Sequence, residues 1–185
     1  MSTSHDSLWA GSRSALRERA FDLYSRWFRR KLSVLFTGKL RARDLELEVR
    51  RLDARSREDV NSLLEQQVDD DDRTVAGIES RRFNFAHSCF VYFGIYNGSE
   101  LAALWWLKIV RRNTVEPSMI IAKKWRGRGL LSSLHHRNEA IYRRQRISHR
   151  YRVNRNNPVM VDFYRKQGVA VDHVEGHLCV YEIRY

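Results

Sequence analysis

The sequence predicts a mixed α/β fold of the α+β type: a mixed, mostly antiparallel central sheet flanked by helices, with an N-terminal amphipathic helical extension. Hydrophobic residues make up 43% of the 185 positions, which is enough for one packed core. Nine glycines and two prolines leave few forced breaks in regular structure. Three strand-like segments follow one another between residues 90 and 122, and this order is typical of a mixed sheet rather than of a doubly wound one.

The first element that the sequence predicts is a helix over residues 12–36, after a loose polar start at residues 1–11. Apolar residues recur there at intervals of three and four, which is the period of a helix with one apolar face. The apolar face is expected to carry Leu16, Ala20, Leu23, Trp27, Phe28, Leu32 and Leu35, and the opposite face Glu18, Arg19, Asp22, Arg26 and Arg29. The Thr37-Gly38 step is expected to end this helix.

Two interpretations of this helix stay open. In the first, it docks its apolar face on the rest of the domain and covers an exposed edge. In the second, it lies on an anionic membrane or binds an acidic partner, as basic amphipathic helices do. In either case we expect this helix to be an extension at the N-terminus of the main domain.

One strand and two short helices are expected between the extension and the central strands. Apolar alternation predicts a strand over residues 44–53. Ser56 and Asp59 have the spacing of a capping box and are expected to begin a helix. The acidic run 69–72 predicts a solvated turn, because four adjacent carboxylates repel one another and cannot all face one metal ion. Residues 76–87 are expected to form a further short helix.

The rest of the chain predicts six strands and two helices. Asn97-Gly98 predicts a two-residue hairpin turn. Asn157-Pro158 and Gly168 are expected to begin and end the last helix. The predicted strands are 90–96, 101–110, 118–122, 150–153, 169–174 and 177–183, and the predicted helices are 129–146 and 158–167.

The charge of the chain is strongly basic, with 34 Lys and Arg against 22 Asp and Glu, a net charge of +12 and a pI of about 10.2. Such a field attracts anions, whether phosphate-bearing cofactors, nucleic acid, acidic carrier proteins or anionic membranes. A surface that serves only solubility is the alternative.

Cysteine usage and hydropathy indicate the compartment. Cys89 and Cys179 cannot form a disulfide framework, and we interpret both as reduced core residues, with a single bridge between them as the alternative. No run approaches the ~20 apolar residues of a membrane-spanning helix, and the N-terminus lacks the apolar region of a secretory signal. We therefore expect a cytoplasmic protein, with peripheral membrane binding as the alternative.

The stretch from residue 118 to residue 131 is the most informative for function, because it predicts a strand, a basic glycine turn and a helix. Gly127 and Gly129 let backbone amides approach a ligand without a Cβ in the way, and the helix N-terminus adds its dipole. The cations around this turn are Lys123, Lys124, Arg126 and Arg128. The pattern suits a diphosphate, although it is neither the G-x-x-x-x-G-K-[ST] nor the G-x-G-x-x-G loop. A glycine turn without a ligand is the alternative.

This stretch resembles the coenzyme-A-binding signature of the GNAT superfamily of N-acyltransferases, Arg/Gln-x-x-Gly-x-Gly/Ala after the fourth strand. Residues 157–169 resemble the second signature of that family, in which an Asn opens a helix that carries a Tyr near its end and stops at a Gly-aromatic step. One helix and one strand separate the two signatures, as the family requires. The resemblance covers roughly residues 45–185 and so implies an acyltransferase domain over 45–185, with residues 1–44 as an N-terminal extension outside it.

The sequence departs from these signatures at identifiable positions. The first signature fits in two registers. The register from Lys124 to Gly129 replaces the leading Arg or Gln with Lys and loses a fork of hydrogen-bond donors. The register from Arg126 to Leu131 keeps the Arg but places Leu131 where Gly or Ala is usual. In the second signature, Val169 stands in place of the closing aromatic residue.

The resemblance implies an enzyme that moves an acyl group from acyl-CoA or acetyl-CoA to a primary amine by direct attack, without a metal. The implied donor contacts are Ile121, Lys124, Arg126, Gly127, Arg128, Gly129, Leu130, Leu131 and Asn157. Tyr164 is implied to protonate the departing thiolate, for which a phenol with a pKa of about 10 is a sensible acid. Glu116 is the candidate general base, with Glu79 or a water-relayed path as alternatives.

Two other functions stay open. A close variant is a long-chain N-acyl synthase that takes acyl-phosphopantetheine on acyl carrier protein as the donor to a small amine or amino acid. The other is a non-catalytic module of the same shape that binds nucleic acid or an anionic membrane. The amine acceptor and the oligomeric state are left open. Adjacent His135 and His136 are expected to splay apart on a helix rather than bind a metal, and Trp105 and Trp106 to point to opposite faces of a strand.

Overall fold

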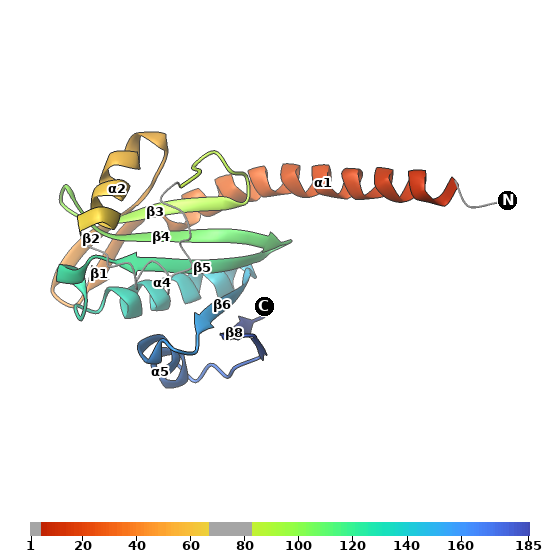
Figure 1. Ribbon diagram of the computed structural model, residues 1–185. Helices are drawn as coiled ribbons and strands as arrows, with labels where there is room; N and C mark the ends of the chain where they lie inside the picture. The colour runs from red at the N-terminus through yellow and green to blue at the C-terminus, as the bar shows by residue number, and fades with distance from the viewer. Residues whose placement is uncertain (1–4, 67–82) are drawn as a thin grey trace.

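The computed structural model of the chain describes residues 5–66 and 83–185, with side chains from residue 15 onward. In this part of the chain one sheet has the strand order β1-β2-β3-β4-β5-β6-β8-β7, and Figure 1 shows the helices packed around it. The strands are β1 (Gly38–Ala42), β2 (Leu45–Arg51), β3 (Phe90–Asn97), β4 (Glu100–Arg111), β5 (Thr114–Ile121), β6 (Ser148–Asn154), β7 (His173–Glu175) and β8 (Leu178–Ile183). The helices are α1 (His5–Phe36), α2 (Arg57–Gln66), α4 (Leu130–Gln145) and α5 (Pro158–Lys166), with 3-10 turns η1 (Ala54–Ser56) and η2 (Lys123–Trp125).

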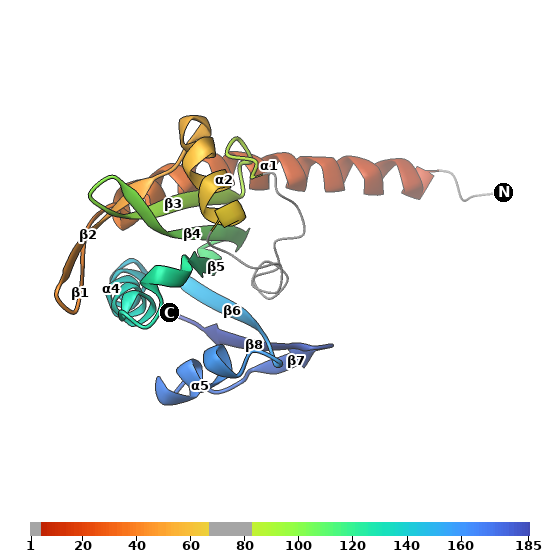
Figure 2. The same ribbon diagram turned by 60° about the vertical axis from the view of Figure 1, so that its left-hand side comes forward.

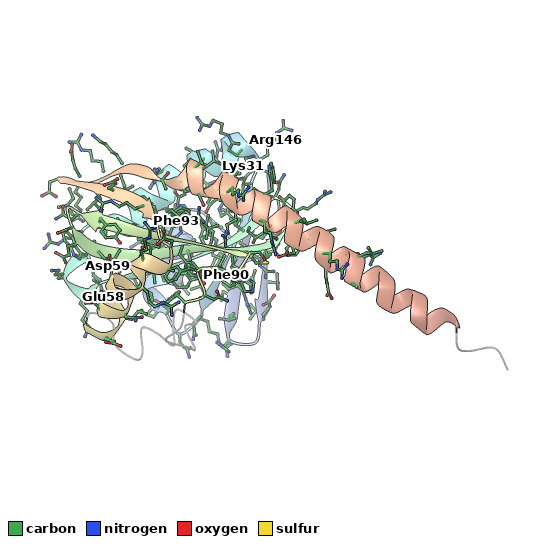
Figure 3. The ribbon with its side chains drawn as sticks, turned by 90° about the horizontal axis from the view of Figure 1, so that it is seen from above. Lys31, Glu58, Asp59, Phe90, Phe93 and Arg146 are labelled. Carbon is green, nitrogen blue, oxygen red and sulfur yellow. The ribbon has the colours of Figure 1, made fainter. Side chains whose placement is uncertain are left out.

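The sheet is mixed but mostly antiparallel, because β5 and β6 are parallel while the other neighbouring strands run antiparallel. Viewed from above in Figure 3, α1 and α4 lie on one face of the sheet and α2 lies on the other. The predicted fold class is therefore confirmed. None of the described helices is long and apolar enough to cross a membrane.

The C-terminal half of α1 is part of the hydrophobic core. Phe28, Leu32 and Phe36 are fully buried. The ring of Phe36 lies 5.4 Å from the ring of Trp105 on β4 and 5.2 Å from the ring of Tyr142 on α4. These contacts join the first helix to the centre of the sheet and to α4, so this half of α1 is held in place by burial of aromatic surface.

Arg137 on α4 satisfies the carbonyl groups at the end of α1. Its guanidinium donates to the Phe36 carbonyl at 3.1 Å and to the Thr37 carbonyl at 2.7 Å. The last carbonyls of a helix have no partner inside the helix, and cations near that end are favoured by the helix dipole. The predicted end of the helix at Thr37-Gly38 is confirmed.

The prediction that α1 has a single apolar face is wrong. Leu16, Leu23 and Trp27 are 65%, 68% and 58% exposed, whereas Phe28 and Leu32 are fully buried. The helix therefore has two apolar stripes, one toward the core and one toward solvent. The periodicity of the sequence identifies the helix, but it does not separate two stripes that have the same period.

Two more features of the N-terminal region differ from the prediction. Helix α1 begins at His5, where the sequence predicts a loose start through residue 11. Strand β1 is not predicted at all, and it pairs with β2 from Gly38↔Val49 to Ala42↔Leu45. Whether residues 1–44 form a unit apart from residues 45–185 stays a prediction.

Helix α2 begins at a different cap from the predicted one. The Asp53 side chain accepts from the Arg55 amide at 2.8 Å, and the Ser56 hydroxyl accepts from the Asp53 amide at 3.4 Å. The capping box therefore joins Asp53 and Ser56 rather than Ser56 and Asp59, because the 3-10 turn η1 comes before α2.

The β3–β4 hairpin turns one residue later than predicted, because Asn97 pairs with Glu100 and leaves Gly98 and Ser99 as the loop. Residues 83–87 form a turn rather than the end of a helix. The rest of that predicted helix and the acidic run 69–72 lie outside the described residues.

The later predicted elements are confirmed in type and order, with boundaries that differ by a few residues. The Asn157 side chain accepts from the Met160 amide at 3.2 Å and so begins α5 as expected.

The two adjacent tryptophans of β4 point to opposite faces of the sheet, as predicted. Trp105 packs on the α1 face of the sheet, whereas Trp106 lies 6.0 Å from Phe83 on the other face. Cys89 and Cys179 are free thiols.

Candidate active site

The parallel strands β5 and β6 part soon after they meet. They pair only at Thr114↔Ser148 and Val115↔His149, although β5 continues to Ile121 and β6 to Asn154. Figure 1 shows the two strands diverging, and Figure 2 shows α4 and α5 on the same side of β6. Beyond Val115, the backbone groups of β5 that face β6 therefore have no neighbouring strand to pair with.

A cavity of about 880 Å³ lies at this divergence. It is bounded by the ends of β5 and β6, the glycine turn, the first half of α4, and α5. Of the predicted site residues, those that line it are Ile121, Arg126, Gly127, Gly129, Leu130, Leu131, Asn157 and Tyr164. Residues far apart in the sequence thus meet at one place, where strand, glycine turn and helix surround a common space.

The glycine turn is built for close approach of the backbone. Gly127 and Gly129 have φ angles of 71° and 82°, a left-handed conformation that side chains disfavour. A Cβ on Gly127 would meet no atom within 4 Å, so this stretch of backbone is open. The first bond inside α4 runs from the Ser133 amide to the Gly129 carbonyl at 2.9 Å.

Gly129 caps α4 without a side chain. The amides of Leu130, Leu131 and Ser132 precede that first bond and therefore have no acceptor within the helix. All three residues line the cavity. A helix N-terminus with open amides favours an anion.

Two of the arginines that line the cavity, Arg126 and Arg43, supply positive charge close to the glycine turn. Arg126 follows the 3-10 turn and donates from Nε to the Ile121 carbonyl at 3.1 Å, which ties it to the end of β5. Arg43 comes from the β1–β2 turn, where its φ angle is 54°, and also lines the cavity. Sequence reasoning missed Arg43 because it missed β1 and hence the hairpin that carries this turn.

Lys124 and Arg128, which the sequence also predicts as donor contacts, are not among the described residues that line the cavity. Lys124 Nζ lies 2.5 Å from Glu100 Oε1, and the Trp125 indole donates to the same oxygen at 2.9 Å. These hydrogen bonds hold the pKa of Glu100 below its ordinary value. The Arg128 guanidinium stacks 5.0 Å from the Trp125 ring. Both cations therefore brace the glycine turn.

Tyr164 on α5 is buried in a cluster of tyrosines and is 3% exposed. Its ring lies 4.5 Å from Tyr151 on β6 and 4.9 Å from Tyr181 on β8. Burial raises the pKa of Tyr164 well above its ordinary value. The Tyr164 hydroxyl therefore stays protonated near neutral pH, as a general acid must be before it donates its proton.

His135 on α4 also lines the cavity, and sequence reasoning treated it only as half of a splayed histidine pair. Its Nδ1 lies 3.4 Å from the Tyr151 hydroxyl, and its ring lies 6.3 Å from the ring of Tyr164. Burial lowers the pKa of His135. A neutral imidazole in a cavity can accept a proton. His135 follows Gly129 by six residues on α4, and only the packing of this helix beside the cavity identifies it as a candidate base.

Glu116, the predicted base, lies on β5 just beyond the last pair with β6. Its Oε2 accepts from Arg150 Nε at 2.9 Å. It is not among the described residues that line the cavity. Glu79, the second option, lies outside the described residues.

The wall of the cavity holds one further polar side chain of note. Asn138 on α4 is 4% exposed, and its Oδ1 has no hydrogen-bond partner. Trp105 lies in the same wall and is 2% exposed. No group of three or more His, Cys, Asp or Glu side chains that could hold a metal ion occurs among the described residues.

A mixed sheet whose two central parallel strands splay beside a glycine turn and a helix N-terminus is the GNAT fold. Solved structures with this fold are similar to the chain over most of their length. The GNAT domain of PAT from S. lividans is 17% identical with a TM-score of 0.66, and the match covers 81% of this chain and 97% of that one.

Several of the similar structures contain coenzyme A or its disulfide. The PaiA N-acetyltransferase from Thermoplasma acidophilum, in complex with coenzyme A, is 22% identical with a TM-score of 0.58, over 75% of this chain and 99% of that one. The spermidine N-acetyltransferase from Vibrio cholerae, in complex with CoA and spermine, is 17% identical with a TM-score of 0.55, over 74% of this chain and 92% of that one. No protein-family model and no curated protein matches the sequence.

Proposed function

We propose that the chain is an N-acyltransferase that transfers an acyl group from a pantetheine thioester, as in acyl-CoA, to a primary amine. One observation carries this proposal. The splayed end of β5, the N-terminal residues of α4 and the buried Tyr164 all line the same cavity. The coenzyme A bound by two proteins of the same fold supports the choice of donor.

The diphosphate of the donor is expected on the glycine turn. In the register from Arg126 to Leu131, the leading Arg and the amides of Leu130 and Leu131 all belong to the cavity wall. Lys124, which leads the other register, is bound to Glu100 instead. The geometry thus favours the register that begins at Arg126, with Arg43 as an additional cation for the phosphates.

The pantetheine arm and the thioester are expected beside β5. On the side of β5 that faces β6, the backbone groups beyond Val115 have no strand partner, so they are expected to bind the amides of pantetheine. One of these N–H groups would stabilise the oxyanion that forms when the amine attacks the thioester carbonyl. The attack forms the new C–N bond, and when the oxyanion collapses the C–S bond breaks and the sulfur leaves as a thiolate.

We expect Tyr164 to give its proton to that thiolate, because this residue lines the cavity and its raised pKa keeps the hydroxyl protonated at neutral pH. His135 is a better-placed base than Glu116. Its ring lies in the same cavity and its lowered pKa favours the neutral form, whereas the Glu116 carboxylate is engaged by Arg150. Removal of a proton from the amine before or during attack would fall to His135.

The donor could also be acyl-phosphopantetheine on acyl carrier protein. Such a carrier is acidic, and the basic wall formed by Arg43 and Arg126 would meet it at the cavity. Comparing the same acyl group on CoA and on carrier protein distinguishes the two donors. A kcat/KM for the carrier-bound thioester that exceeds that for acyl-CoA would identify the carrier as the donor.

Native mass spectrometry with CoA and acyl-CoA donors of graded chain length tests the proposal, with Gly127→Glu as the variant. Gly176→Glu is the matched control, because both glycines have positive φ angles, 71° and 58°, and open space around a Cβ. Of these two glycines, only Gly127 lines the cavity. The wild type and Gly176→Glu should retain the donor, and Gly127→Glu should lose it because its carboxylate repels the diphosphate.

A second assay follows release of free thiol in the presence of a panel of amines. Donor binding followed by thiol release that depends on the amine would establish acyl transfer and narrow the acceptor. A folded wild type that retains no donor of any length would overturn the proposal. It would favour the non-catalytic module that binds nucleic acid or membrane.

A further inference from the structure

The outward side of α1 carries a line of exposed apolar side chains. Leu16, Leu23, Trp27 and Val34 are 65%, 68%, 58% and 78% exposed. Their spacings of seven, four and seven residues place them within about 40° of one another around a helix that turns about 100° per residue. We call these four residues the outer stripe. The buried residues of the same helix, such as Leu32, lie on the opposite side.

Basic side chains border the outer stripe on both sides. By the same helical geometry, Arg19, Arg26 and Arg30 fall on one side of it, and Arg17 and Lys31 fall on the other. Lys31 Nζ lies 5.9 Å from the Trp27 ring, and Arg26 also pairs with Asp22 at 2.9 Å. The side of the helix that faces solvent is therefore apolar along its middle and positive along its borders.

The position of α1 leaves this side accessible. Figures 1 and 3 show the helix lying along the sheet with its C-terminal half and projecting beyond it with its N-terminal half. In Figure 3, Lys31 is on the part of α1 that lies over the body, while Phe93 is within the body. The outer stripe runs along both halves, so its exposure continues onto the part that packs on the core.

The charge of the borders identifies the partner. Two copies of this helix packed stripe to stripe would place Arg and Lys against Arg and Lys in either orientation, and like charges beside an apolar seam oppose pairing. A surface with dense negative charge and an apolar interior satisfies both parts of the pattern. An anionic phospholipid bilayer is such a surface.

We propose that the outer stripe of α1 is an interfacial membrane-binding site for bilayers that contain anionic phospholipids. The helix would lie in the plane of the interface, with Leu23 and Trp27 inserted among the acyl chains and the arginines reaching the phosphates. The opposite side of α1 would keep its contacts with the sheet, so the whole domain would sit against the bilayer. This proposal does not depend on the acyltransferase activity.

Vesicle flotation tests the site, using the full chain with vesicles of phosphatidylcholine alone or mixed with phosphatidylglycerol. The wild type should float only with the mixed vesicles. Leu23→Gln with Trp27→Gln should weaken binding by at least about tenfold, because two apolar side chains no longer enter the bilayer. The matched control is Val171→Gln with Val174→Gln, two exposed apolar residues away from α1, which should bind like the wild type.

A charge variant tests the borders of the stripe separately. Arg19→Gln with Arg30→Gln should also weaken binding to the mixed vesicles, and added salt should weaken the wild type more than this variant. Equal binding of the wild type and the Leu23/Trp27 variant would overturn the proposal, as would equal binding to the two kinds of vesicle. A dimer in analytical ultracentrifugation that the Leu23/Trp27 variant abolishes, with no flotation, would assign the stripe to a second copy of the chain.

Discussion

Arg43 in the β1–β2 turn lies against Gly129 at the start of α4: a Cβ on Gly129 would sit 3.5 Å from both Cγ and Nε of Arg43. A cation from the first hairpin is thereby brought to the open amides of the helix. The candidate diphosphate site is therefore made from two parts of the chain that are 86 residues apart.

Replacing Arg43 should weaken donor binding through the diphosphate alone. We expect Arg43→Gln to raise the Kd for CoA about tenfold, because a charge-assisted hydrogen bond is lost. Isothermal titration calorimetry measures this change, and pantetheine, which lacks the diphosphate, should bind the variant and the wild type equally. Arg41→Gln, an exposed neighbour on β1, is the control. An equal loss for pantetheine would show that Arg43 shapes the cavity instead of binding phosphate.

Removing the Tyr164 hydroxyl should slow the chemical step. Tyr164→Phe is expected to lower kcat by about 100-fold or more, with little change in donor affinity, because the thiolate loses its proton donor. Since burial raises the pKa of Tyr164, the wild type should show no loss of activity from its ionisation in the mildly alkaline range. Tyr181→Phe changes a stacking partner of Tyr164 and serves as the control. An unchanged kcat in Tyr164→Phe would make Tyr164 a core residue.

The pH dependence of kcat/KM should report His135. A base acts only when it is neutral, so activity should fall as the pH drops through the pKa of His135. Burial lowers that pKa from 6.5, which places the acid limb below this value. His135→Gln should remove the limb, and His136→Gln, its exposed neighbour, should keep it. The assay should use an acceptor amine of low pKa, because such an amine stays neutral and its own ionisation does not produce an acid limb. An acid limb that survives in His135→Gln would rule out His135 as the base.

Glu139 should contribute to stability above mildly acidic pH. Burial alone would raise its pKa, but His149, whose Nε2 lies 3.3 Å from Glu139 Oε2, together with His135 and Arg143 outweighs burial, and the pKa is lowered. A carboxyl whose pKa is lower when folded stabilises the fold above its unfolded pKa and loses that contribution as the pH falls through the folded one. Urea unfolding at several pH values should therefore show a loss below about pH 4.3 that is smaller in Glu139→Gln. An identical pH dependence in the two proteins would contradict this.

Gly94 on β3 should tolerate no side chain. A Cβ there would lie 2.8 Å from Leu101 Cδ1 and 3.0 Å from Leu52 Cδ2, and it would also collide with the buried Tyr96 ring. We expect Gly94→Ala to lower the free energy of unfolding by about 1–3 kcal/mol, because the core must shift to admit the methyl group. Chemical denaturation measures this. An unchanged free energy of unfolding would mean that the neighbouring side chains rearrange at no cost.

The parts of the fold that the sequence predicts well are those set by local patterns. The cap at Asn157 and the helix that begins after Gly129 depend on residues adjacent in the chain, and both are confirmed. The glycine turn is local in the same sense. The cap at Asp53 was missed because its 3-10 turn resembles the first turn of the helix that follows.

The candidate site was predicted only in part, because several of its members are defined by contacts across the fold. Arg43 reaches the site through the pairing of β1 with β2, and His135 faces it because α4 packs beside α5. Lys124 forms an ion pair with Glu100, and Glu116 forms an ion pair with Arg150, and neither residue lines the cavity. Each of these outcomes depends on a partner that no spacing along the chain identifies.

The amino-acid sequence by itself determined the order of the elements and the place of the glycine turn, because helical and strand periods and turn residues act over a few neighbouring positions. The tertiary structure alone decided which stripe of α1 enters the core, where β5 and β6 part, and which cations face the cavity. These depend on strand register and on the packing of distant segments, which burial of the whole core selects at once. The outer stripe of α1 shows the difference: the pattern marks Trp27 and Phe28 alike, and only packing leaves Trp27 in solvent.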